Sequence, residues 1–202
     1  MPVRTIGLTG GIGSGKSTVG RMLVDLGAHL VDLDAISRGL TAPGGAAITA
    51  IAREFGPQAI DMQGAMDRAQ MRTLAFSNPL ALARLEAILH PLIGEQSQAQ
   101  ALLAKPGQVV VFDVPLLVEA GARWREQVDR IVVVDCGPET QIQRVMARSN
   151  WDRQAVDAVM AKQATREQRA VMADHVLFND GVSFEELRDQ VRNMWELWNN
   201  AG

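Results

Sequence analysis

The sequence predicts a three-layer α/β fold, in which a parallel sheet of five strands lies between layers of helices. Short apolar runs recur along the chain and are followed by segments with apolar residues at helical spacing. The first apolar run leads directly into a cluster of glycines, a pattern typical of a turn between a strand and a helix. The 202 residues, with 47% hydrophobic and 21% charged side chains, suffice for one such domain with elaborations.

The strands are predicted where apolar residues run together, at residues 5–9, 29–33, 108–113, 130–135 and 175–178. The first helix, 17–26, stops at Gly27, which suits the position after a helix end. A later helix, 138–148, has proline in its first turn. Further helices are predicted at 34–40, 153–172 and 183–198.

A long helical block separates the second predicted strand from the third. Residues 46–104 contain no convincing strand, and breaks at Gly56-Pro57, Gly64, Asn78-Pro79 and His90-Pro91 predict three or four helices. The block is too long for a simple crossover, so we predict an inserted substrate-side subdomain. The division is then a core of about 1–33, 105–148 and 173–202 with an insert of about 34–104.

Charge and cysteine content exclude several protein classes. The net charge of −3 argues against a general nucleic-acid binder. The apolar runs are too short to span a bilayer and no targeting segment is visible, so we expect no membrane association. The single cysteine, Cys136, cannot form an internal disulfide, which fits a reducing, cytoplasmic compartment.

The glycine cluster matches a nucleotide-binding motif at every fixed position. Residues 10–17 read G-x-x-x-x-G-K-S, the P-loop pattern, in which backbone N–H groups wrap a polyphosphate. The lysine reaches the β- and γ-phosphates of ATP, and the serine is a ligand of Mg²⁺. The alternative is a glycine-rich turn without a ligand, but the preceding strand and following helix favour phosphate binding. The predicted ATP-binding residues here are Gly11, Ile12, Gly13, Ser14, Gly15, Lys16, Ser17 and Thr18.

Among P-loop proteins, the sequence favours a small-molecule kinase. A guanine-nucleotide switch needs an N-K-x-D motif, and the chain contains no Asn-Lys pair. A D-x-x-G string at 61–64 lies in the helical block rather than after a strand. The chain is also short for a motor or transporter ATPase. A regulatory protein that binds ATP and switches a partner remains the alternative from another class.

Two carboxylates follow the second predicted strand, which we expect to end beside the P-loop. If the strand extends that far, Asp32 and Asp34 share one face. One would then hydrogen-bond an acceptor hydroxyl while the other holds a Mg²⁺-bound water. A weak base suffices, because a loose phosphoryl transition state needs the hydroxyl oriented rather than deprotonated early. The alternative is a solvated strand end with Asp34 capping a helix.

Further candidates follow the third and fourth strands. Asp113 follows an apolar strand as a Walker-B aspartate does and would hold Mg²⁺ through water, with Asp135 as a weaker rival. Arg144 and Arg148 lie four apart and share a helix face, from which a guanidinium could stabilise the transferring phosphoryl group. The alternative for both arginines is ordinary solvation.

Five segments together resemble the dephospho-CoA kinase family. They are G-L-T-G-G-I-G-S-G-K-S-T at 7–18, V-D-x-D-x-x-x-R at 31–38, L-H-P-L at 89–92, D-V-P-L-L-x-E at 113–119 and A-D-x-V-x-x-N-x-G at 173–181. The resemblance extends from Ile6 to about Val191. Leu33 is a departure, because alanine is more usual between the two aspartates.

The resemblance implies transfer of the γ-phosphate of ATP to the ribose 3′-hydroxyl of dephospho-CoA, with Mg²⁺ as cofactor. This reaction gives CoA and ADP and is the last step of CoA biosynthesis. It also implies a P-loop core, a helical CoA-side domain and a mobile lid at about 149–172. We expect a monomer or weak homo-oligomer.

The resemblance also assigns roles to individual residues. It makes Asp34 the base and Arg144 the catalytic arginine, with Lys16 in the P-loop. Arg148 begins the lid, and Asn179 and Gly181 lie at the adenine of ATP. The implied acceptor-side residues are Asp32, Asp34, Arg38, His90, Pro115, Leu116 and Glu119. The lid segment carries four cations that would close over ATP or remain solvated: Arg153, Lys162, Arg166 and Arg169. For Arg153 and Lys162 we favour ordinary solvation.

Overall fold

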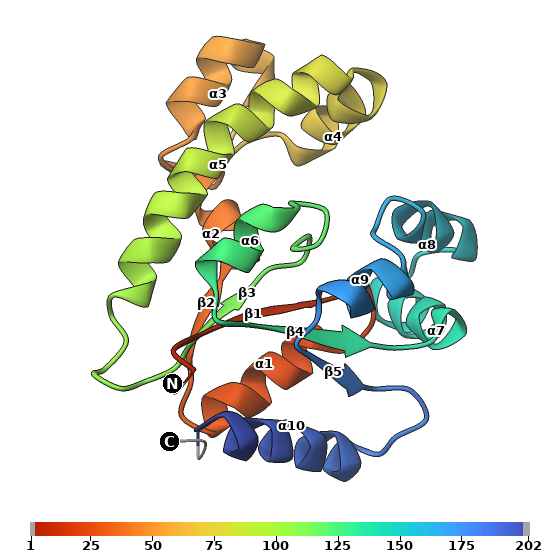
Figure 1. Cartoon of the computed structure of the whole chain (residues 1–202). Coiled ribbons are helices and arrows are strands. Elements are labelled where there is room, and N and C mark those ends of the chain that lie inside the picture. The colour runs from red at the N-terminus through yellow and green to blue at the C-terminus, as the bar shows by residue number, and fades with distance from the viewer. Residues whose placement is uncertain (1–2, 200–202) are drawn as a thin grey trace. The chain divides into compact units, whose positions relative to one another are not determined.

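The structure is a computed structural model that describes residues 3–199 (Figure 1). The chain divides into two compact units. One consists of Met1–Val31 and Ala104–Gly202, and the other of Asp32–Leu103. Within the described residues, no helix is both long enough and apolar enough to cross a membrane.

The first unit is built on the parallel sheet that the sequence predicts. Its strands within the described residues have the order β2-β3-β1-β4-β5, and β1 pairs in parallel with both β3 and β4. Because the strands run the same way, their carboxyl ends meet at one edge, where α/β proteins bind ligands. The strands are β1 (Thr5–Gly10), β2 (His29–Asp32), β3 (Val110–Asp113), β4 (Arg130–Asp135) and β5 (His175–Phe178).

Alternation along β1 decides which residues enter the main core. Ile6 and Leu8 are buried in one cluster with apolar residues of α1 (Lys16–Asp25) and α10 (Phe184–Asn199). Helix α10 contributes Leu187, Val191 and Met194, which follow helical spacing and so form one face. Figure 1 shows α1 and α10 lying together against the same face of the sheet.

The opposite face of β1 is covered by the segment after β3. A Cβ atom at Gly7 would stand 2.8 Å from Cδ1 of Leu117, so a larger residue here would force the Leu117 side chain to move. The segment continues into α6 (Ala122–Gln127), which the sequence analysis did not predict. Six residues are too short to display an apolar period, although the rings of Phe112 and Trp124 lie 5.7 Å apart.

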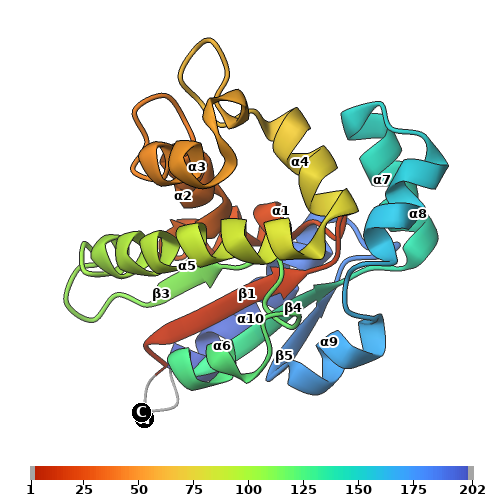
Figure 2. The same ribbon diagram turned by 90° about the horizontal axis from the view of Figure 1, so that it is seen from above.

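The predicted lid helix 153–172 is in fact two helices. Helix α7 (Pro138–Ser149) is followed by α8 (Arg153–Met160) and then α9 (Arg166–Met172). A capping box in which the Thr165 and Gln168 side chains bond each other's backbone N–H groups starts α9 afresh. Figure 2 shows α7 and α8 side by side.

The second unit is helical. It contains α2 (Leu33–Leu40), α3 (Ile48–Phe55), a 3₁₀ turn (Pro57–Ala59), α4 (Arg68–Ser77) and α5 (Pro79–Ala101). The predicted break at His90-Pro91 is wrong, because α5 continues through the proline. Buried residues on both sides of it, Leu85 and Ser97, hold the two halves of α5 in one helix.

Candidate active site

The P-loop connects β1 to α1 and adopts a backbone that needs glycine. Gly13 and Gly15 have φ angles of 72° and 94°, in the left-handed region. A Cβ atom at Gly15 would stand 2.2 Å from Nδ2 of Asn179. Helix α1 begins at Lys16 and presents its N-terminal N–H groups to the loop. This geometry suits binding of a polyphosphate.

Asp113 is the carboxylate that meets the P-loop lysine. It ends β3, the strand beside β1, and its side chain pairs with Nζ of Lys16. Asp135, the rival candidate, is instead paired with Arg166, whose Nε lies 2.9 Å from Oδ1. This pairing raises the pKa of Arg166 above its ordinary value, through the hydrogen bond to Asp135. Asp113 is therefore the better placed of the two to act beside the phosphates.

The oxygen donors around the loop suit Mg²⁺. The Ser17 hydroxyl lies in the exposed first turn of α1, and Asp113 supplies a carboxylate on the neighbouring strand. Among the described residues, no group of three or more His, Cys, Asp and Glu could hold a metal. Mg²⁺ does not need such a cage, because it keeps several waters and binds through one or two protein oxygens plus phosphates.

Arg144 reaches the P-loop from α7. Its Nη1 lies 3.5 Å from the carbonyl oxygen of Ser14 and 3.5 Å from Sγ of Cys136. Burial raises the pKa of the Cys136 thiol, so this sulfur stays protonated and does not neutralise the guanidinium. Arg144 therefore carries an available positive charge beside the loop. Arg148, one turn later, is exposed.

Asn179 supports the P-loop directly. Its side chain is buried after β5, and Nδ2 donates a hydrogen bond of 2.7 Å to the carbonyl of Ser14. The next residue, Asp180, accepts hydrogen bonds from the Thr140 hydroxyl and the Gly137 N–H. The Thr140 bond is the main reason why the pKa of Asp180 lies below its ordinary value. Gly181 then turns the chain with a φ angle of 66°.

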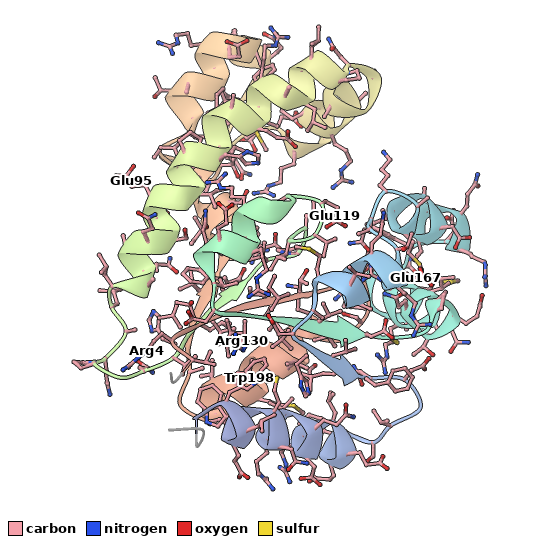
Figure 3. The ribbon with its side chains drawn as sticks, in the orientation of Figure 1. Arg4, Glu95, Glu119, Arg130, Glu167 and Trp198 are labelled. Carbon is pink, nitrogen blue, oxygen red and sulfur yellow. The ribbon has the colours of Figure 1, made fainter. Side chains whose placement is uncertain are left out.

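The segment after β3 contacts both the sheet and the predicted lid. The Thr9 hydroxyl donates to the carbonyl of Pro115 at 3.4 Å, while Leu116 is exposed. Glu119 comes from the loop before α6 and accepts a 2.7 Å hydrogen bond from the N–H of Ala164 (Figure 3). The carboxylate of Glu119 thus has a backbone partner in the connection between α8 and α9.

The remaining predicted residues belong to the second unit. Strand β2 ends at Asp32 and α2 begins at Leu33, so the two aspartates do not share a strand face as expected. Asp32 is the helix cap, accepting from the Ala35 N–H at 2.8 Å, and Asp34 is exposed in the first turn. The expectation that β2 ends beside the P-loop also needs correction, because β3 lies between β2 and β1.

Two other side chains of this unit complete the predicted acceptor set. Nη2 of Arg38 lies 3.6 Å from Oδ2 of Asp32, so the two residues form an ion pair at the start of α2. His90 is exposed on α5.

Sequence reasoning missed two glutamines that hold the loop. Gln141 donates from Nε2 to the carbonyl of Ile12 at 2.8 Å, and the N–H of Ile12 donates to Oε1 of Gln163 at 2.9 Å. Arg169, named only as a lid cation, is buried next to Gly11. Glutamine carries no motif signature, so only tertiary structure could reveal these contacts.

Unpartnered buried atoms also gather at this loop. Among the described residues, the buried side-chain nitrogens and oxygens without a hydrogen bond are Oγ of Ser14 and Nε of Arg169. Buried polar atoms are normally satisfied, and exceptions are expected at functional sites.

Comparisons with known proteins identify the family. The sequence model of the dephospho-CoA kinase family matches residues 4–185. A dephospho-CoA kinase of Bordetella pertussis is 56% identical over 194 residues, covering 96% of this chain and 90% of the relative.

Solved structures support the same fold. TT1252 from Thermus thermophilus has a TM-score of 0.83 at 31% identity and covers 96% of both chains. Dephospho-CoA kinase from Campylobacter jejuni has a TM-score of 0.65 at 20% identity, with 98% of both chains covered. The predicted fold class and family are confirmed. The P-loop, its lysine on Asp113 and the extent of the family match lead to one conclusion: the chain belongs to the dephospho-CoA kinase family.

Proposed function

We propose that the protein transfers the γ-phosphoryl group of ATP to the ribose 3′-hydroxyl of dephospho-CoA, giving CoA and ADP, the final step of CoA biosynthesis. The observation that carries the proposal is a P-loop whose Lys16 pairs with Asp113, in a chain that matches the family over residues 4–185. In the reaction, the 3′-oxygen bonds to the γ-phosphorus while the bond from that phosphorus to the ADP oxygen breaks.

On the ATP side, N–H groups of the loop other than that of Ile12, which donates to Gln163, bind the phosphates. Lys16 binds the β- and γ-phosphate oxygens, and the carboxylate of Asp113, no longer paired with this lysine, would then be available to Mg²⁺. Ser17 and Asp113 would hold Mg²⁺, which supplies neutralising charge on those oxygens. Arg144 adds a fixed positive charge from α7. Residues 149–172 act as the lid, and Arg148, Asn179 and Gly181 lie on the nucleotide side.

On the acceptor side, Asp34 orients the 3′-hydroxyl and accepts its proton. Its side chain is exposed at the start of α2, whereas Asp32 is engaged as the helix cap, which favours Asp34 as the base. The Asp32–Leu103 unit acts as the CoA-side insert. The remaining proposed acceptor contacts are Asp32, Arg38, His90, Pro115, Leu116 and Glu119. The buried, free Cys136 continues to favour a cytoplasmic compartment, with the protein as a monomer or weak homo-oligomer.

An ADP-release assay with a panel of acceptors tests the proposal. The panel is dephospho-CoA, AMP, CMP, adenosine and pantothenate, and phosphorus NMR locates the new phosphate on the product. We expect turnover with dephospho-CoA and phosphate on the 3′-oxygen. Turnover confined to another acceptor would overturn the assignment.

The role of Asp34 is tested separately. Asp34→Asn should lower kcat by about 100-fold or more, because an oriented base contributes roughly 10²–10⁴. Asp25→Asn is the matched control, since Asp25 is exposed at the end of α1. Full activity of Asp34→Asn would reject the base and leave the acceptor assignment intact.

A further inference from the structure

The backbone of Ile12 is held from two directions by residues far away in the sequence. Its N–H donates to Oε1 of Gln163 at 2.9 Å, and its carbonyl accepts from Nε2 of Gln141 at 2.8 Å. Ile12 lies between β1 and α1, outside regular secondary structure, so no helix or strand ladder fixes these two groups. The two glutamines therefore set the orientation of this part of the P-loop.

The two glutamines differ in how firmly they are themselves anchored. Gln141 is buried on α7 and belongs to a regular helix. Gln163 lies in the connection between α8 and α9, where its own N–H donates to the carbonyl of Met160 at 3.1 Å. The adjacent Ala164 provides further anchorage, because its N–H donates to Glu119 and its carbonyl accepts from Nη1 of buried Arg169. Glu119 is therefore one of the side chains that fix the position from which Gln163 contacts the loop.

The space around Gly11 shows how closely these groups surround the loop. A Cβ atom at Gly11 would stand 2.4 Å from Nε2 of Gln141 and 3.1 Å from Nη2 of Arg169. Gln141, Gln163 and Arg169 also line one pocket of about 330 Å³ beside α7 and α9. A shift of the α8–α9 connection must therefore either carry the loop with it or release the N–H of Ile12.

We infer that Gln163 is a positioning residue for nucleotide binding, which holds the P-loop through the N–H of Ile12 and is itself held in place by Glu119 through Ala164. The inference rests on the proposed function only in taking ATP as the nucleotide. It gives Glu119 a task on the ATP side, in addition to the acceptor contact proposed above. In this hydrogen bond the N–H of Ile12 is the donor, so the essential atom of Gln163 is its side-chain oxygen, the acceptor.

A variant of nearly equal side-chain length and no charge isolates this oxygen. Gln163→Met removes the acceptor and keeps the length. Gln154→Met is the matched control, since Gln154 is exposed on α8. The affinity of each variant for ATP and for inorganic tripolyphosphate is measured by calorimetry without acceptor, so the result does not depend on the identity of the acceptor.

We expect Gln163→Met to bind both ligands roughly 3- to 10-fold more weakly, the usual effect of one lost hydrogen bond. Gln154→Met should match the unmodified protein. In turnover, the KM for ATP should rise in Gln163→Met with little change in kcat. Unchanged affinity in Gln163→Met, or an equal loss in Gln154→Met, would overturn the inference.

A double-mutant cycle tests the link to Glu119. Glu119→Ala should weaken ATP binding in the same direction as Gln163→Met, and the double variant should lose less than the product of the two single losses. Multiplicative losses would overturn the link, because Glu119 would then act independently of Gln163. If dephospho-CoA proves not to be the acceptor, the cycle still decides the inference, since it measures nucleotide binding alone.

Discussion

Replacing Asn179 with alanine removes a single buried contact from the P-loop. The amide nitrogen of Asn179 donates to the Ser14 carbonyl at 2.7 Å, and Nη1 of Arg144 at 3.5 Å is the side-chain donor that remains near this oxygen. The backbone of Asn179 stays anchored, because its own N–H donates to the carbonyl of Asp135 at 2.8 Å. The substitution therefore acts on the loop rather than on the strand that precedes it.

The size of the effect follows from the burial of this contact. A buried acceptor left without its partner costs about 1–3 kcal/mol. Because Arg144 retains a weak contact with the same oxygen, we expect the lower part of this range, about 1–2 kcal/mol. This corresponds to a roughly 5- to 30-fold loss of phosphate affinity.

Calorimetric titration with two ligands distinguishes the possible roles of Asn179. ATP carries an adenine, whereas inorganic tripolyphosphate carries none. If the side chain acts through the loop, Asn179→Ala weakens both ligands by the same factor. Asn179→Asp should bind at least as weakly, because its carboxylate cannot donate to a carbonyl. Asn193→Ala is the matched control, because Asn193 is exposed on α10.

Two patterns of results would refute this reasoning. Weaker ATP binding with unchanged tripolyphosphate binding would mean that Asn179 contacts the adenine, the role that the family resemblance implies. Unchanged binding of both ligands would mean that the hydrogen bond to Ser14 does not control the loop.

Three further predictions concern pH, helix continuity and the loop backbone. Burial lowers the pKa of His175, so near the ordinary histidine pKa of about 6.5 the unfolded chain binds more protons than the folded one, and stability falls as pH drops. Between about pH 8 and about pH 5.5, the Tm of His175→Phe should therefore decrease less than the Tm of the unmodified protein. An equal decrease would contradict this. Pro91→Ala restores an N–H inside α5 and should raise the free energy of unfolding by about 1–3 kcal/mol in urea titrations, whereas a decrease would show that the ring packs usefully. Gly15→Ala places a side chain on a residue with a φ of 94°, which costs about 1–2 kcal/mol, and brings its Cβ atom against Asn179. Calorimetry should show weaker ATP binding, and the losses from Gly15→Ala and Asn179→Ala should combine less than additively. Additive losses would exclude the clash.

The parts of the fold that sequence predicts well are those set by local pattern. The run of valines ending at Asp113 forms a strand in any sheet, and the spacing of Gly10, Gly15 and Lys16 fixes a phosphate loop without tertiary information. The end of the second strand depends on a competition. Asp32 was expected inside the strand, but its carboxylate caps the next helix and stops the strand one residue earlier than predicted.

The parts that sequence predicts poorly depend on contacts between distant segments. Pro91 breaks a helix by local rules, yet residues packed on both sides of it keep α5 continuous. The hydrogen bonds of Gln141 and Gln163 with Ile12 join residues more than a hundred positions apart in the sequence, and no spacing rule connects them. The sequence likewise could not show whether Asp135 pairs with a cation or holds Mg²⁺. The structure shows its ion pair with Arg166.

The central place of β1 in the sheet has a consequence for synthesis of the chain. Thr5 pairs with Val110 and Ile6 with Arg130, so β1 has no neighbouring strand until more than a hundred further residues have been made. The helical residues 32–103 emerge in the meantime, and their local contacts form quickly. During that interval the nascent chain carries an apolar strand with two open edges, which is a site for mispairing and for chaperone binding.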